Sequence, residues 1–212
     1  MQETLLPLLY LETVLFPGQR KVITLKDEAS EALVRYVMET GERIGVLWKD
    51  AQVGCVARVE RELGVDESGF MEVLITGEER FRLREVRHER RYPMGVVEWI
   101  PEPARRIHLP LRERAITQHI KFLELRGKPL RLHIYQDVRR VSYVIGQQAG
   151  LTQKQRQKLL ELASENERIA FLVRHFAQVL PRMEEVQLIR RKIRSNGHFK
   201  ENPPILGEDA PE

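Results

Sequence analysis

The amino-acid sequence predicts an α+β protein in which a group of short β-strands precedes a group of helices. In the first half of the chain, apolar and polar residues mostly alternate, which is typical of half-buried strands. In the second half, apolar residues recur every three or four positions, as they do along one face of a helix. The period changes near Pro101 and Pro103. We therefore expect a β-barrel subdomain over residues 1–103, a helical subdomain over 104–199 and a flexible tail over 200–212.

The start of the chain contains two apolar runs, which are separated by Phe16-Pro17-Gly18. Pro17 has a fixed φ and no backbone N–H, and Gly18 tolerates a positive φ, so the pair predicts a turn between two strands. Burial of apolar side chains in a barrel core would stabilise this arrangement. The side chains beside the turn that are expected to enter that core are Leu15, Phe16, Val22 and Ile23.

The strands are predicted to be short and to be separated by turn residues. Those after the first apolar run are expected at residues 20–25, 44–48, 54–60, 70–76, 79–86 and 95–100. Gly77 stands between two of them and is predicted to be the turn of a hairpin. Strands of this number and length favour a small barrel that is closed or nearly closed, because closure removes exposed strand edges.

One helix is predicted to be inserted among the strands. Asp27 precedes it as a candidate N-cap, and Gly41 follows it as a candidate C-cap. Its apolar positions recur with helical spacing and are Ala29, Ala32, Leu33, Tyr36 and Val37.

Helical periodicity dominates the second half of the chain. Gly127 and Gly150 are expected to end the first two helices, and a capping-box pattern opens each of the next two. Pro181 is expected to interrupt the last stripe, which resumes as far as Asn196 and Gly197. The predicted helices begin near Leu111, Asp137, Thr152 and Ser164. Together they predict a helical bundle.

Composition narrows the classes of protein to which the chain can belong. Cys55 is the single cysteine, which excludes an intramolecular disulfide and a site made of several cysteines. No apolar run approaches the ~20 residues of a membrane span, and the first residues do not resemble a signal or transit peptide. A cytoplasmic location is the default expectation. The formal net charge of +4 is concentrated between Arg182 and Lys200.

The sequence predicts no catalytic residue, cofactor or metal site. Gly127-Lys128 lacks the upstream glycine and the hydroxyl residue of a phosphate-binding loop. The six histidines show no metal-ligand spacing, and no serine lies in a Gly-x-Ser-x-Gly motif. Cys55 lies among small apolar residues of a predicted strand, where a buried cysteine is ordinary and a catalytic thiolate is the alternative.

Large aromatic rings and a basic helix face are the candidate partner-binding features. Aromatic side chains supply contact area at low entropic cost, although core packing is the alternative interpretation for each of them. The basic residues of the segment 189–194 face away from its apolar stripe, which fits a solvated face, RNA or an acidic protein. Tyr92 is the favoured aromatic anchor because it precedes Pro93 in a predicted loop. The candidates are Trp48, Tyr92, Trp99, Arg190, Arg191 and Arg194.

Several motifs, in order, resemble the Lon N-terminal domain family. Leu6-Pro7-Leu8 followed by Phe16-Pro17-Gly18 is similar to the family's first strand and turn. The later segments that match are Gly54–Val59, with Cys55 in place of the usual threonine, Val73–Leu83, Tyr92–Glu98 and Leu151–Phe176. IRRKIRSNGHFK at Ile189–Lys200 is similar to the end of the short stand-alone members.

The resemblance implies a PUA-like β-pseudobarrel followed by a helical subdomain that holds protein substrates. The ATPase loop and the Ser–Lys proteolytic segment of full Lon proteases have no counterpart in this sequence. The leading hypothesis is therefore a non-enzymatic module that binds polypeptide through an exposed apolar groove between barrel and helices. RNA recognition by the barrel together with the Arg190–Arg194 helix is the alternative, and an enzyme with dispersed residues is the third. The oligomeric state stays open.

Overall fold

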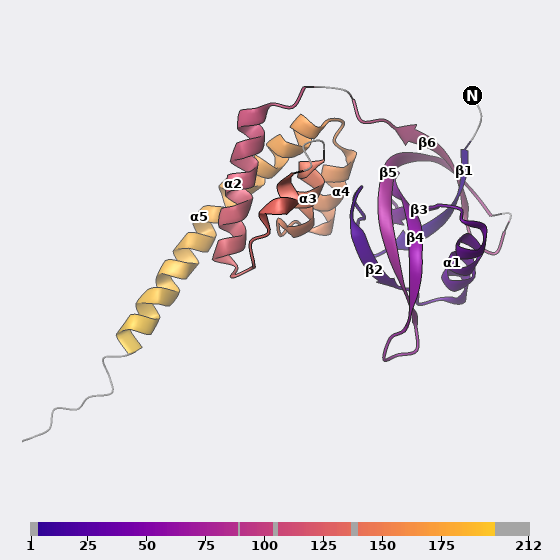
Figure 1. Ribbon diagram of the computed structural model, residues 1–212, viewed down its shortest axis with the longest axis horizontal. Helices are drawn as coiled ribbons and strands as arrows, with labels where there is room; N and C mark the ends of the chain where they lie inside the picture. Colours follow the sequence, from indigo (N-terminus) through magenta and orange to yellow (C-terminus); the bar gives the residue numbers. More distant parts are fainter. Residues whose placement is uncertain (1–3, 89, 104–105, 137–139, 198–212) are drawn as a thin grey trace, which may run out of the picture.

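The computed structural model describes residues 4–88, 90–103, 106–136 and 140–197. It confirms the α+β class, because a six-stranded mixed sheet precedes the larger group of helices (Figure 1). The strands are β1 (Thr4–Leu11), β2 (Arg20–Thr24), β3 (Ile44–Trp48), β4 (Val53–Val65), β5 (Met71–Arg87) and β6 (Met94–Ile100). The helices are α1 (Glu28–Thr40), α2 (Leu109–Leu125), α3 (Val141–Gln148), α4 (Gln153–Glu161) and α5 (Glu165–Gly197), with a 3-10 turn at Leu132–Tyr135. The predicted tail over 200–212 lies outside the described residues.

Five of the strands close into a ring. The sheet order is β2-β5-β4-β3-β1-β6, and β6 pairs back onto β5, with Phe81 opposite Trp99. The β1–β3 pair is parallel and the others are antiparallel. Each ring strand contributes to one apolar cluster, which therefore fills the ring. Its buried members are Leu6, Leu8, Leu47, Val56, Phe81, Leu83 and Val97.

The opposite face of the strands packs against α1 and β2. Alternate strand residues such as Leu9, Val46 and Cys55 enter this second cluster, together with Leu33 and Val37 of the helix. The predicted caps are present at both ends of α1. The Asp27 carboxylate accepts a hydrogen bond from the Ser30 backbone N–H at 2.9 Å, and Gly41 adopts a φ of 71°.

The prediction of a hairpin at Gly77 is wrong, because β5 runs through this residue without a turn. Gly77 instead allows another part of the chain to come very close. A Cβ built on Gly77 would stand 2.3 Å from the Phe16 carbonyl oxygen. The Gly77 N–H donates to the Gln19 oxygen, and the Gly18 N–H donates to the Gly77 oxygen. The glycine therefore marks a backbone contact inside a strand.

The segment around Phe16 also differs from its prediction. Pro17 and Gly18 do form a turn, with a Gly18 φ of 75°, but β1 already ends at Leu11. Phe16 is fully buried in the helical core rather than in the barrel, and its ring stacks on Tyr143 with centroids 5.5 Å apart. Leu15 and Ile23 are buried, but in the cluster between the strands and α1 rather than inside the ring, whereas Val22 is 45% exposed.

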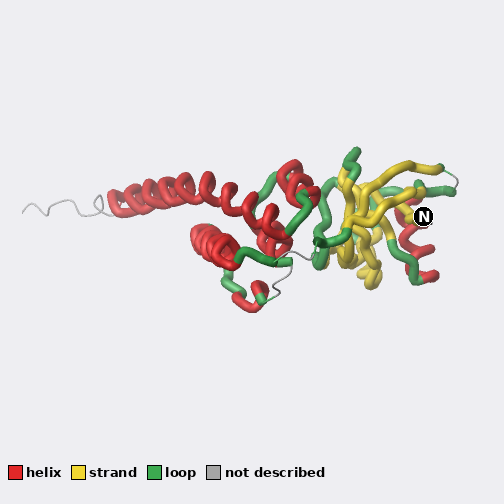
Figure 2. Tube along the Cα trace, turned by 90° about the horizontal axis from the view of Figure 1, so that it is seen from above, coloured by secondary structure: helices red, strands yellow, loops and turns green. Residues whose placement is uncertain are grey.

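The helices form a separate layer beside the barrel, and α5 extends away from it (Figure 2). The expectation that Pro181 interrupts the last helix is wrong, since α5 continues through it to a length of 33 residues. A proline inside a helix costs about 3 kcal/mol. Packing against α2 on both sides of Pro181 offsets this cost, through buried Leu180 and through the Gln187 amide, which donates to the Leu125 oxygen.

Candidate functional site

Arg80 of β5 joins the barrel to the end of α4. Its guanidinium donates to the carbonyl oxygens of Leu160 and Leu162 at 2.9 and 2.7 Å. The last carbonyl groups of a helix have no partner within the helix. A cation placed there donates hydrogen bonds to them and interacts favourably with the helix dipole. Arg80 is only 2% exposed. This buried arginine therefore fixes how the barrel and the helices are oriented.

A chain of charges continues from Arg80 into the helices. Glu102 follows β6, and its carboxylate pairs with Arg80 at 3.0 Å and with Arg168 of α5 at 2.7 Å. Arg168 is fully buried and also pairs with Glu165 at 3.0 Å, while Glu165 accepts from the Ser142 backbone N–H. Each of these four charged side chains thus has at least one oppositely charged partner.

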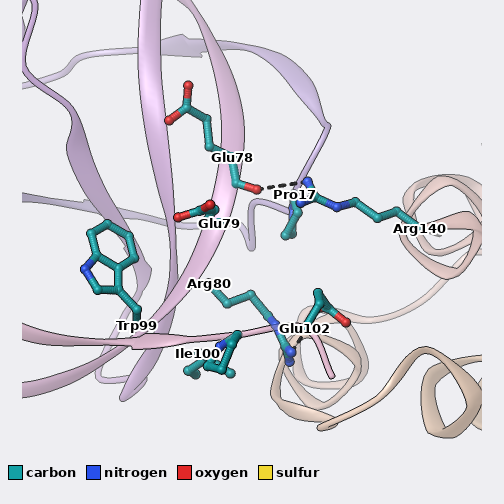
Figure 3. A pocket seen from close by; sticks show the side chains of 9 residues that line it. Pro17, Glu78, Glu79, Arg80, Trp99, Ile100, Glu102 and Arg140 are labelled. Carbon is teal, nitrogen blue, oxygen red and sulfur yellow. Dashed lines mark hydrogen bonds and ion pairs between the residues drawn. The ribbon is translucent and has the colours of Figure 1, made fainter. Parts of the chain in front are cut away.

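A hollow of about 360 Å³ lies beside these charges. Figure 3 shows Trp99 on one side of it and Arg140 reaching across to the Glu78 carbonyl oxygen, a contact of 3.1 Å. Five of its nine lining residues are charged, which differs from the apolar groove expected between barrel and helices. Its residues are Pro17, Glu78, Glu79, Arg80, Trp99, Ile100, Pro101, Glu102 and Arg140.

An apolar groove lies instead between the end of α2 and the second half of α5. Its volume is about 600 Å³, the largest among the hollows of the described residues that we compare. The apolar lining consists of Leu125, Val179, Met183 and Val186, and the polar lining consists of Arg126, Arg182, Gln187 and Arg190. This groove combines an apolar floor with a basic rim.

The sequence-predicted partner residues do not form one site. Trp48 is half-buried against the helical core, and Tyr92 is buried next to Tyr36, with ring centroids 5.9 Å apart. Trp99 lines the junction hollow under the Arg43 guanidinium. Arg190 lies on the groove rim. The side chains of Arg191 and Arg194 are outside the described part of the structure.

Sequence reasoning found the basic rim through Arg190 but missed the wall that α2 supplies. The apolar stripe of the last helix was visible in its periodicity, and Val186 belongs to it. Gly127 indicated that α2 would end near Leu125, but no local signal indicated that this end would lie beside that stripe. Arg80 and Glu102 were also missed, because an isolated charge in the sequence gives no sign of a distant partner.

Two buried titratable groups, Cys55 and His119, are held in their neutral forms. Cys55 is fully buried, and burial raises the pKa of its thiol, which disfavours the thiolate. Burial lowers the pKa of His119 to about 4, and its Nδ1 lies 2.7 Å from the Tyr135 hydroxyl. Among the described residues, no three His, Cys, Asp or Glu side chains gather as they would around a metal ion.

The barrel, the helices joined to it through Arg80 and the open apolar groove define an α+β module. The chain belongs to the ATP-dependent protease La (LON) substrate-binding domain family, whose model matches residues 5–178. Within the described residues, no helix combines the length and apolar character needed to cross a membrane.

Solved structures and a curated relative agree with this family. A Lon N-terminal domain protein from Xanthomonas campestris is 24% identical, with a TM-score of 0.64 over 80% of this chain and 97% of that one. The N-terminal domain of Mycobacterium avium complex Lon protease is 20% identical, with a TM-score of 0.66 over 84% of this chain and 100% of that one. A Lon protease from Amoebophilus asiaticus is 24% identical over 87% of this chain, which spans only 24% of that protein.

Proposed function

We propose that this chain binds polypeptide segments in the groove between α2 and α5, and that it catalyses no reaction by itself. The single observation that carries the proposal is the apolar floor of that groove, where Val186 remains 47% exposed. An exposed apolar surface of this kind indicates an interaction site. The substrate-binding description of the family supports the same conclusion. The whole α5 wall, which begins at Val179, follows the last residue that the family model matches, so this wall is argued from the chain's own geometry.

The chemistry of the groove indicates what kind of segment it would bind. Apolar side chains spaced along one face of a helix can fill a floor made of Leu125, Met183 and Val186. Arginines at positions 126, 182 and 190 rim the floor, which favours acidic residues beside the apolar ones. The preferred ligand is therefore an unfolded or helical segment with apolar anchors and acidic neighbours.

Fluorescence anisotropy with labelled, reduced and carboxymethylated α-lactalbumin tests this proposal, because that protein is unfolded and acidic. Val186→Ser is expected to weaken binding about fivefold or more, since it removes apolar contact worth about 1 kcal/mol or more. Leu188→Ser is the matched control, because Leu188 is a similarly exposed apolar residue of α5 that does not line the groove. Equal losses in the two variants, or no binding by the unaltered chain, would contradict the proposal.

Two further measurements separate this proposal from its alternatives. The purified chain is expected to leave casein intact and to hydrolyse no ATP, so turnover of either would show an enzyme. RNA binding would lose affinity steeply with rising salt because it depends on counterion release, whereas capture by an apolar floor would weaken little. Recovery of tightly bound RNA with such a salt dependence would favour the alternative function.

A further inference from the structure

A second cleft, which shares no lining residue with the α2–α5 groove, lies between β1 and β2. Its volume is about 310 Å³, and its walls are the end of β1 with the two residues that follow and the whole of β2 after Arg20. In the order of the described strands, β2 stands at the end of the sheet and pairs only with β5. No pairing among the described strands joins β1 to β2, so an open seam lies between these two strands beside the closed ring.

The main chain on both walls of the cleft has groups that are directed into the seam. The Leu25 N–H donates to the Met71 oxygen, so residues of that parity along β2 face β5. In a regular antiparallel ladder the residues between them, Val22 and Thr24, direct their N–H and C=O groups to the open edge. On the other wall, the Leu8 N–H donates to Pro93 on the side away from β3, and alternation places the Tyr10 main chain on that same side.

The charged residues that line the cleft are Glu12, Lys21, Lys26 and Asp27. Glu12 pairs with Lys49 and Asp27 caps α1, which leaves Lys21 without an acidic partner among the described residues. The Lys21 side chain lines the cleft, and its Nζ donates to the Thr13 hydroxyl at 3.4 Å. No carboxylate among the described residues forms an ion pair with it. Burial lowers the pKa of Lys21, and the Arg156 guanidinium lowers it further. An anion placed beside Lys21 would relieve both effects.

We propose that this cleft binds the carboxyl-terminal residues of a polypeptide in extended conformation, with the terminal carboxylate at Lys21 and Thr13. The proposal rests on the polypeptide-binding function proposed above and assigns it a second site. Lys21 lies near the start of β2 and the cleft continues to Leu25 and Asp27, so the bound chain runs antiparallel to β2. Main-chain groups of Val22 and Thr24 would pair with it as an added strand.

The charge and the lining together select this occupant. A free strand edge alone would accept any extended segment, but the unpaired ammonium complements a carboxylate. The apolar lining from Leu9, Leu11, Ile23 and Leu25 favours apolar residues ahead of that carboxylate. RNA would offer phosphates, but it has no main-chain amides for the edge of β2.

Two fluorescein-labelled hexapeptides, Thr-Val-Thr-Val-Thr-Val with a free carboxylate and the same peptide as a C-terminal amide, test the proposal by anisotropy. The full chain is expected to bind the free acid about tenfold more tightly than the amide, as for one charge-assisted hydrogen-bonded pair. Lys21→Met should bring the two affinities to within about twofold of each other. Lys26→Met is the matched control, because Lys26 lines the same cleft but is exposed, and it should preserve the tenfold preference.

Val22→Pro removes one outward N–H from an edge strand, where proline is tolerated, and should weaken both peptides about fivefold or more. Val22→Thr keeps the N–H and should bind nearly as the unaltered chain does. Circular dichroism confirms that each variant is folded. Equal affinities for acid and amide, an unchanged preference in Lys21→Met, or binding of neither peptide would overturn this inference. The binding of labelled α-lactalbumin is measured on the same samples, so that a failure of the proposed α2–α5 groove can be distinguished from a failure of this cleft.

Discussion

The junction between barrel and helices and the groove between α2 and α5 show two opposite uses of an interface. At the junction, Arg80, Glu102 and Arg168 are held together by ion pairs and by helix-end carbonyl groups. At the groove, apolar side chains such as Val186 remain in contact with water. Because buried charges tolerate little displacement, the junction orients the molecule. The groove has no comparable internal partner among the described residues, which is why we propose it as a surface for polypeptide binding.

The same contrast runs along α5 alone. In its first half Ile169, Leu172 and Phe176 are completely buried, whereas in its second half Ile189 and Ile193 are 50% and 67% exposed. The cause is the difference in length between the two packed helices, since α2 has 17 residues and α5 has 33. Where an apolar stripe extends beyond the end of the helix it packs against, its side chains are exposed on the surface instead of buried in the core.

The largest expected effect tests the junction. Arg168→Met leaves the buried Glu165 carboxylate without its ion-pair partner and leaves Glu102 with Arg80 alone, which costs about 3–5 kcal/mol of unfolding free energy. Arg84→Met is the control, because the Arg84–Glu98 pair lies on the surface and its loss costs less than about 1 kcal/mol. Guanidinium chloride unfolding measures both. Similar losses in the two variants would mean that the junction is held by packing rather than by charge.

Local signals predicted the parts of the fold that depend on neighbouring residues. Asp27 and Gly41 cap the two ends of α1 as expected, and Thr152 forms a complete capping box with Gln155. The errors arose where a distant segment decides the conformation. Gly77 is a residue type typical of turns, but here it allows close contact with the Phe16 backbone. Pro181 lies within a continuous helix because α5 packs against α2. Neither partner could be identified from the residues beside these positions.

The candidate site was predictable only in part, for the same reason. The stripe and basic face of the last helix identified Arg190, because helical spacing is written in the sequence. Tyr92 was favoured as an anchor because it precedes a proline, yet the ring packs on Tyr36 and is buried. A ring beside a turn can fold back onto a neighbouring helix, and sequence alone does not show where that helix lies.

A medium effect tests the closed part of the α2–α5 interface, where His119 lies against Phe176. Burial lowers the His119 pKa to about 4, so the unfolded chain binds a proton more readily than the folded chain below the ordinary pKa of about 6.5. The part of the folding stability that depends on a neutral His119 is complete above pH 6.5 and is lost as the pH falls towards 4. Between pH 7 and 5, the native chain should lose about 2 kcal/mol more than His119→Gln. Urea unfolding at the two pH values measures these losses. An equal loss of unfolding free energy in both proteins would contradict the stated environment of His119.

The smallest expected effect concerns the groove itself. Val186→Ser should change the unfolding free energy by less than about 0.5 kcal/mol, because a half-exposed side chain on a helix surface loses little packing. Leu172→Ala, in the buried half of the same helix, should cost about 2–5 kcal/mol. Urea unfolding compares the two. A large loss in Val186→Ser would show that the groove residues stabilise the fold, and the reduced polypeptide binding expected of this variant would then no longer report on a contact with the ligand.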